Sequence, residues 1–306
     1  MLSNRSRQRR GSFNWKHLAI ILVFAVIVIG ILLPAITRVR DGDGARSESR
    51  NNLKQIGLSA LLYNDTHGFL PWNGSPLAAP PLINLQGLPQ AGVPYSGTWC
   101  YQILPFIEQE YLFKTANPKT SREFIRTFYC PGRNRPRDAS YTDYAINCFL
   151  NTGSERGQNT SAAVNASCTG RTFRDVIDLD GTSNTIFAGH KFVNTQHYGE
   201  INQVAGEGVA INNAFTFVDN NDANGGSIAT GRGNSGYLRD NDSTESSTGI
   251  WGGPFPSGGL FVFVDGSVRT LPYSMANGAD NSPAGNQSTM FYRALAPDDG
   301  QKITFP

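Results

Sequence analysis

The sequence lacks the short motifs that mark the commonest classes of enzyme. It has no G-x-S-x-G nucleophile motif, no Walker phosphate-binding loop and no H-E-x-x-H metal motif. Acidic residues are also absent before Asp41, so the N-terminal segment supplies no carboxylate. These absences favour a protein without catalytic activity and without a cofactor.

Cysteines are few, and their spacing matches no zinc finger. The four are Cys100, Cys130, Cys148 and Cys168. They allow three disulfide pairings, which the sequence alone does not separate. Cys148–Cys168 would close a short loop over a polar stretch, and isolated buried thiols are the alternative.

Charge is sparse after the N-terminus. The chain has 26 basic and 24 acidic residues, and only 16% of its residues are charged. Arg5, Arg7, Arg9, Arg10 and Lys16 lie together near the start, with no acid among them. No later cluster of lysine or arginine is interleaved with aromatic residues. The sequence therefore argues against nucleic acid as a partner.

The most prominent feature is the uncharged run Leu18–Ile36, which holds nineteen residues. A helix rises about 1.5 Å per residue, so this run nearly matches a hydrocarbon core of about 30 Å. The excess of positive charge before the run predicts an N-terminus in the cytoplasm. We therefore expect a single-pass protein of the cytoplasmic membrane, with its C-terminal domain periplasmic or surface-exposed. A cleaved signal peptide is the alternative, but Pro34-Ala35-Ile36 is a poor cleavage site.

A second helix is expected after the apolar run. Leu53, Ile56, Ala60 and Tyr63 recur at steps of three and four, which places them on one helical face. Gly68 should end this helix. The glycines of 41–44 leave two alternatives, one long kinked helix or two helices with a short joint.

The remaining sequence predicts strands and long loops. It is rich in Gly, Asn, Ser and Thr, with strand-like content at 185–193, 209–218 and 260–271, and a short helix is expected at 99–113. Asp265-Gly266 predicts a tight two-residue hairpin turn with positive φ. We therefore predict an α+β fold with four parts: a cytoplasmic basic tail (1–17), a transmembrane helix (18–36), a helix continuing into the head (37–66) and a β-rich exported domain (67–306).

Several segments together resemble a known family. They occur in the family's order, as Asn51–Gly57, Asn64–Gly68, Ile103–Gln109, Tyr129–Pro131, Asp180–Ile186 and Gly258–Arg269. They resemble the prepilin-like proteins catalogued as domain of unknown function 1559, which are abundant in planctomycete-type bacteria. The resemblance implies a pilin-like plan, in which a long N-terminal helix packs its outer half on an antiparallel sheet. It also implies similarity to the pseudopilins of type II secretion, no established enzymatic activity, and contact between like subunits through the helix.

The chain departs from the family pattern at both ends. Gly11, Ser12 and Phe13 are the candidates for prepilin-type processing, but the glutamate that prepilins carry five residues into the mature helix is missing. That position is Lys16 when counted from Gly11 and His17 when counted from Ser12. Near the C-terminus, Phe255 stands where the family often has a histidine. Separately, His190, in the strand-like run 185–193, stands where the family commonly has a glutamate. Any metal or proton chemistry of that family histidine is therefore not expected here.

Three candidate binding sites remain, and the first and third have a purely structural alternative, such as a turn, a loop or core packing. Asp178, Asp180, Asp219 and Asp222 lie in oxygen-rich segments that suit calcium, or else form turns and solvated loops. His190, His197 and Glu200 would make a metal site of no standard spacing. Trp72, Trp99 and Trp251 either line a sugar-binding groove or fill the core. The sequence thus predicts a membrane-anchored, pseudopilin-like structural protein, and the alternative is a tethered module that binds a glycan or solute.

Overall fold

The computed structural model places most of the head and one long helix. It describes residues 15–72, 99–115, 123–136, 142–150, 170–198, 231–232, 236–243, 250–276, 289–297, 300 and 303. The chain divides into two compact units, Met1–Gly44 and Ala45–Pro306. We describe each unit by itself.

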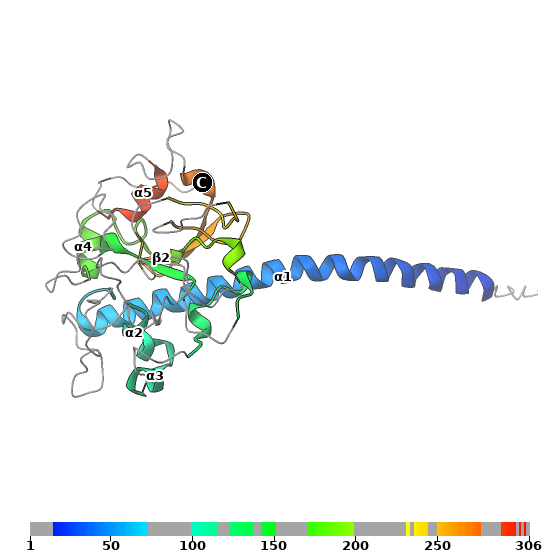
Figure 1. The fold of residues 1–306 in the computed structure, drawn as a ribbon, viewed down its shortest axis with the longest axis horizontal. Coiled ribbons are helices and arrows are strands. Elements are labelled where there is room, and N and C mark those ends of the chain that lie inside the picture. Colours follow the sequence, from blue (N-terminus) through cyan, green and yellow to red (C-terminus); the bar gives the residue numbers. More distant parts are fainter. Residues whose placement is uncertain are drawn as a thin grey trace, which may run out of the picture. The chain divides into compact units, whose positions relative to one another are not determined.

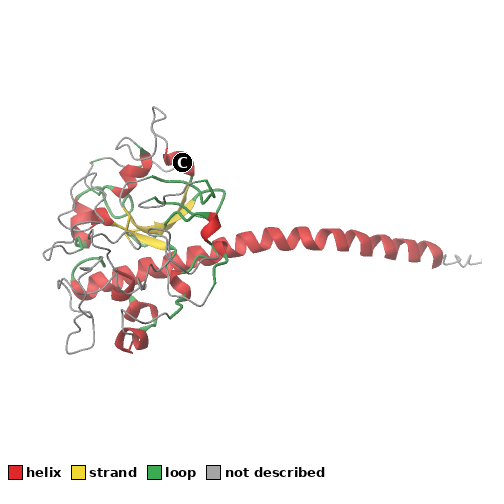
Figure 2. Cartoon of the chain, viewed as in Figure 1, coloured by secondary structure: helices red, strands yellow, loops and turns green. Residues whose placement is uncertain are grey.

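The described elements are short, apart from the first helix (Figures 1 and 2). The α-helices are α1 (Trp15–His67), α2 (Trp99–Gln102), α3 (Glu110–Thr115), α4 (Phe173–Asp178) and α5 (Met290–Leu295). The strands are β1 (Tyr144–Asn147), β2 (Ile186–His190), β3 (Gly231–Arg232), β4 (Gly259–Phe263) and β5 (Val268–Leu271). The 3-10 helices are η1 (Leu104–Ile107), η2 (Arg126–Phe128), η3 (Pro131–Arg133), η4 (Cys148–Leu150), η5 (Thr195–His197) and η7 (Tyr273–Ala276).

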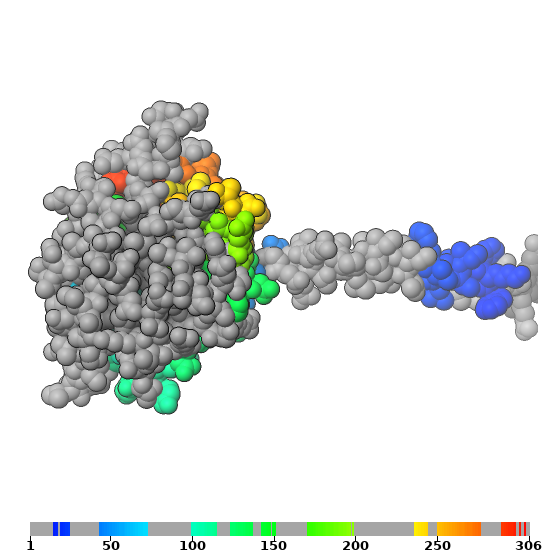
Figure 3. Space-filling model, in the orientation of Figure 1, coloured from blue at the N-terminus to red at the C-terminus, as the bar shows by residue number. Residues whose placement is uncertain are grey.

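The first unit contributes the beginning of α1. Its described side chains from Ile20 to Phe24 are between 57% and 67% exposed (Figure 3). The side chains of Leu18 and of residues 25–42 lie outside the described residues, and so does most of the predicted span 18–36. Among the residues that are described, no helix is long and apolar enough to cross a bilayer.

The second unit holds the rest of α1, which packs on the head as the sequence pattern predicts. Leu53, Ile56, Ala60 and Tyr63 are all buried. The main chain is helical through 41–44, so the structure has one helix in place of two. It ends at His67, and Gly68 follows with φ 87° and donates its N–H to the Asn64 carbonyl.

The described strands form one sheet with the order β3-β1-β2-β4-β5. The pairs β1–β2, β2–β4 and β4–β5 are antiparallel, and β3 pairs in parallel with β1 at the edge of the sheet. Alternate residues of β4 face opposite sides: Leu260 and Val262 belong to the core cluster with α1, and Phe261 and Phe263 to the cluster with α5. Both faces of the sheet are therefore covered, which explains why this strand is apolar throughout.

Close backbone contact holds α1 on the sheet. A Cβ added at Gly57 would lie 2.5 Å from Cγ2 of Val262, so a side chain larger than hydrogen would push the helix away from β4. Basic residues one turn apart then hold the helix to β5 and its turn. Arg46 donates to Thr270 Oγ1, Arg50 donates to the Val268 carbonyl, and Lys54 donates to the Gly266 carbonyl.

The β4–β5 hairpin occurs where the sequence predicts it, but its turn is longer than two residues. Gly266 donates its N–H to the Phe263 carbonyl, and only Gly266 has positive φ, at 76°. Asp265 caps the turn by accepting the Ser267 N–H at 2.8 Å. Residues 263–266 thus form a four-residue turn whose last residue is a left-handed glycine, which is a common hairpin loop and requires positive φ at one position only.

The single helix predicted for 99–113 is wrong. The segment forms three pieces, α2, η1 and α3, because Pro105 lacks an N–H and cannot continue a helix from α2. Glu108 then adopts a left-handed conformation with φ 62°, which separates η1 from α3.

Candidate functional site

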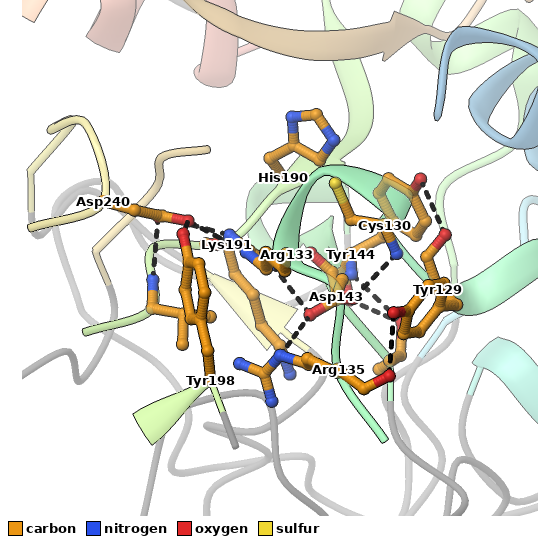
Figure 4. Close-up of polar contacts among 12 residues, drawn as sticks. Tyr129, Cys130, Arg133, Arg135, Asp143, Tyr144, His190, Lys191, Tyr198 and Asp240 are labelled. Atoms are coloured by element: carbon orange, nitrogen blue, oxygen red, sulfur yellow. Dashed lines mark hydrogen bonds and ion pairs between the residues drawn. The ribbon is translucent and has the colours of Figure 1, made fainter. Parts of the chain in front are cut away.

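The main concentration of polar side chains in the described head is buried between α1 and the loops around β1 and β2 (Figure 4). We call it the polar centre. Its members are Ser49, Cys130, Arg133, Arg135, Asp143, Tyr144, His190, Lys191, Tyr198 and Asp240. Each of these residues except Tyr198 is at most 7% exposed. Charged residues are almost never buried to this degree unless they are paired.

Arg133, at the end of η3, lies between two carboxylates in Figure 4. Its Nε donates to Asp240 Oδ2 at 2.9 Å, and its Nη1 donates to Asp143 Oδ1 at 2.8 Å. Nη2 donates to the Lys191 carbonyl and to Asp240 Oδ1. One guanidinium therefore joins the segments that carry η3, the start of β1, the end of β2 and the 236–243 loop.

Both carboxylates are saturated with donors. Asp143 also accepts the Cys130 N–H at 2.7 Å and contacts Arg135 Nε at 3.2 Å. Asp240 also accepts the Val193 N–H at 3.0 Å and the Tyr198 hydroxyl at 2.5 Å. Every oxygen of both carboxylates thus accepts at least one hydrogen bond from the protein, so each carboxylate binds protein groups.

The pKa values follow from burial opposed by charge. Burial alone would raise the pKa of Asp143, but Arg135, Arg133 and the Cys130 N–H outweigh it, so the pKa is lowered. Burial alone would lower the pKa of Arg133, but Asp240 and Asp143 raise it well above its ordinary value. Burial raises the pKa of the Cys130 thiol to about 12, so the thiolate required of a nucleophile is not formed near neutral pH.

Ser49 and His190 form the other half of the polar centre and superficially resemble a catalytic pair. His190 Nε2 lies 2.7 Å from Ser49 Oγ, and the Leu260 N–H donates to His190 Nδ1 at 3.1 Å. A backbone N–H can only donate, so Nδ1 accepts and the proton of the neutral ring resides on Nε2. His190 therefore donates to Ser49 and cannot remove its proton.

Burial reinforces this conclusion. It lowers the pKa of His190 to about 3, with Arg133 contributing in the same direction. Ser49 also lies 2.8 Å from the Tyr144 hydroxyl, and both residues are 0% exposed. The arrangement joins α1 to β1 and β2 through a buried hydrogen-bond chain, in which His190 is not placed to act as a base.

A comparison with models of protein families shows to which family the chain belongs. The model of the family described as "protein of unknown function (DUF1559)" matches residues 45–278. The chain belongs to this family. No curated protein and no solved structure gave a match. The matched range begins where the second compact unit begins, at Ala45, and includes the whole polar centre.

Two residues at which the sequence resemblance implies a different residue type, His190 and Phe255, lie close together in the structure. The rings of His190 and Phe255 lie 5.6 Å apart between centroids. Phe255 is 7% exposed and packs in the core cluster beneath α1. A neutral imidazole and a phenyl ring are thus neighbours in this chain.

Of the four predicted calcium residues, the structure describes Asp178 and Asp180. Asp178 ends α4 and faces Arg174 at 3.7 Å, whereas Asp180 is buried and accepts the Gly300 N–H at 2.9 Å. Asp219 and Asp222 lie outside the described residues. Within the described ranges, no group of three or more His, Cys, Asp or Glu could hold a metal ion.

The other predicted sites divide between described and undescribed residues. The side chains of His197 and Cys148, together with Glu200, Cys168 and the processing candidates Gly11, Ser12 and Phe13, lie outside the described residues. Cys100 and Cys130 are buried thiols. Trp72, Trp99 and Trp251 are each 0% exposed, so they fill the core and do not line a groove.

Proposed function

We propose that this chain is a membrane-anchored, pseudopilin-like structural or assembly protein whose head lies outside the cytoplasmic membrane and has no catalytic activity. Helix α1 is the feature that carries the proposal. Its first described apolar side chains, Ile20–Phe24, are exposed and continue in the sequence as the uncharged run to Ile36. A run of this length suits a hydrocarbon core.

The polar centre supports a structural role for the head. It fixes α1 through the hydrogen bond between Ser49 and His190. The Nε2 of His190 that faces Ser49 already carries a proton, so this nitrogen cannot act as a base toward the Ser49 hydroxyl. The alternative of a glycan-binding module loses its proposed aromatic lining, since three of the four tryptophans are fully buried. A rigid attachment between head and helix is what an assembling subunit needs.

The face of α1 turned away from the head supplies a surface for like subunits. Leu58 and Leu62 are one turn apart and are 47% and 51% exposed. Asn51 and Asp65 continue the same exposed stripe at helical spacing. We propose that neighbouring copies contact one another along this stripe.

The first experiment tests anchoring. The full chain is produced in a bacterial host, membranes are washed with alkaline carbonate, and the N-terminal residue of the retained protein is determined. We expect retention of the chain and digestion of the head by protease added to spheroplasts. A start at Ser12 or Phe13 would add prepilin-type processing, whereas release into the soluble fraction without detergent would refute the anchor.

The second experiment tests contact between copies. Leu58→Cys or Leu62→Cys is introduced with Cys148→Ser and Cys168→Ser, and membranes are treated with an oxidant. We expect disulfide-linked dimers. The matched control is Ile177→Cys, which replaces another exposed aliphatic residue of the head, 53% exposed, away from α1. Equal crosslinking at residues 58 and 177 would show only random collision.

A further inference from the structure

The start of α1 combines three exposed features that together suit one kind of partner. Trp15 is 71% exposed, Lys16 and His17 beside it are exposed, and the exposed apolar residues Ile20–Phe24 follow within two turns. We propose that this segment, Trp15–Phe24, binds the anionic headgroups of a phospholipid leaflet, with Lys16 as the residue that prefers them. This proposal rests on the anchoring proposed above and adds the chemistry of the lipid.

The order of side chains matches the layers of a membrane surface. Tryptophan is enriched at the level of the headgroups because its ring is apolar and its N–H is polar. Lysine can extend along an apolar surface while its ammonium reaches the phosphates. The aliphatic residues after Ala19 would then enter the hydrocarbon. The sequence changes from cationic to apolar within one helical turn of this point.

Charge complementarity selects anionic over zwitterionic lipid. Lys16 follows four arginines, and no acidic residue occurs before Asp41. Within the described part of the first unit, no ion pair satisfies Lys16. One basic residue near an anionic membrane surface favours binding by about 1 kcal/mol, which is about fivefold. A zwitterionic headgroup has no net charge and offers no such gain.

The tryptophans of this chain make the proposal directly measurable. All four lie in the described residues, and Trp72, Trp99 and Trp251 are 0% exposed inside the head. Quenching of emission by a lipid that must touch the indole therefore reports Trp15. Trp15→Phe removes that signal and serves as the control for its origin.

The test compares two quenchers in the same membrane. The full chain is reconstituted into vesicles of phosphatidylglycerol and phosphatidylcholine, with bromine near the headgroup end of the acyl chains of only one lipid at a time. At equal mole fraction, we expect brominated phosphatidylglycerol to quench Trp15 more than brominated phosphatidylcholine does. The ratio of the two association constants should lie between one and about five. Lys16→Gln should bring the ratio toward one, and so should molar salt, which shortens the screening length to about 3 Å.

The outcomes separate this inference from the proposed function. Equal quenching by both lipids, unchanged by Lys16→Gln, would leave the anchor intact and overturn the lipid preference. No quenching by either lipid would place Trp15 away from any bilayer and overturn both. Lys114→Gln, a half-exposed lysine of the head, is the matched control and should leave the ratio unchanged.

Discussion

Removing the guanidinium of Arg133 should cost more stability than any other single substitution at the polar centre. Its side chain and that of Asp143 are 0% exposed, and that of Asp240 is 1% exposed. Arg133→Met would leave Asp240 with only the Val193 N–H and the Tyr198 hydroxyl as donors. Breaking a buried pair by removing one partner costs about 3–5 kcal/mol, because the remaining charge stays desolvated.

A lysine at position 133 separates the effect of the planar guanidinium from the effect of its positive charge. Arg133→Lys keeps a cation but replaces a planar group that reaches two carboxylates and a carbonyl with a single ammonium. We expect an intermediate loss, about 1–3 kcal/mol for the charged hydrogen bonds that are not remade. In Arg133→Met with Asp240→Leu, the two losses should be less than additive by about 0.5–3 kcal/mol.

The assay is urea unfolding of residues 45–306, followed by the emission of the three buried tryptophans. The matched control is Arg126→Met, which breaks the exposed pair of Arg126 with Glu48 and should leave the unfolding curve nearly unchanged. A loss below about 1 kcal/mol for Arg133→Met, or equal losses for Met and Lys, would refute the network as a source of stability.

Three further predictions concern the contacts around α1 and β2. The pKa of His190 is lowered by burial to about 3, so the unfolded chain binds a proton that the folded chain does not between pH 6.5 and about 3. The free energy of unfolding of the wild type, relative to that of His190→Gln, should therefore decrease as the pH is lowered through that window, by up to about 1.4 kcal/mol per pH unit. A difference that stays constant with pH would contradict this. Ser49→Ala removes the acceptor of the His190 Nε2–H and should cost about 1–3 kcal/mol in urea unfolding, whereas Ser49→Thr keeps a hydroxyl acceptor and should cost less. A Cβ at Gly189 would lie 2.1 Å from Phe261 Cδ1, so Gly189→Ala should cost about 1–3 kcal/mol or more, while Gly44→Ala, which meets no atom within 4 Å, should leave the melting temperature of the full chain unchanged or raised.

The features predicted correctly from sequence are those with local physical causes. The face of α1 in the head follows from apolar residues at steps of three and four, and its end follows from Gly68. The β4–β5 hairpin follows from an apolar run that meets Asp265-Gly266. The turn was mis-assigned because Asp-Gly suits both a two-residue turn and a longer loop that needs positive φ only at the glycine.

The polar centre was not predictable in the same way, because its contacts are remote in sequence. Ser49 and His190 are 141 positions apart, and Arg133 and Asp240 are 107 apart. Strand β1 was missed as well, since four residues carry too little periodicity to distinguish a strand. One signal was available: Arg133 and Arg135 follow the Tyr-Cys-Pro motif in a chain with few charges, and cations beside a buried motif require buried partners.

The packing of His190 against Phe255 favours an uncharged side chain at position 190. A glutamate at 190 would be buried beside a phenyl ring that can neither donate a hydrogen bond nor carry a positive charge. A neutral histidine avoids that cost, because Ser49 and the Leu260 N–H satisfy its two nitrogens without help from Phe255. The two side chains are therefore compatible as neighbours: His190 makes its hydrogen bonds to Ser49 and Leu260, and Phe255 packs in the core cluster that includes residues of α1.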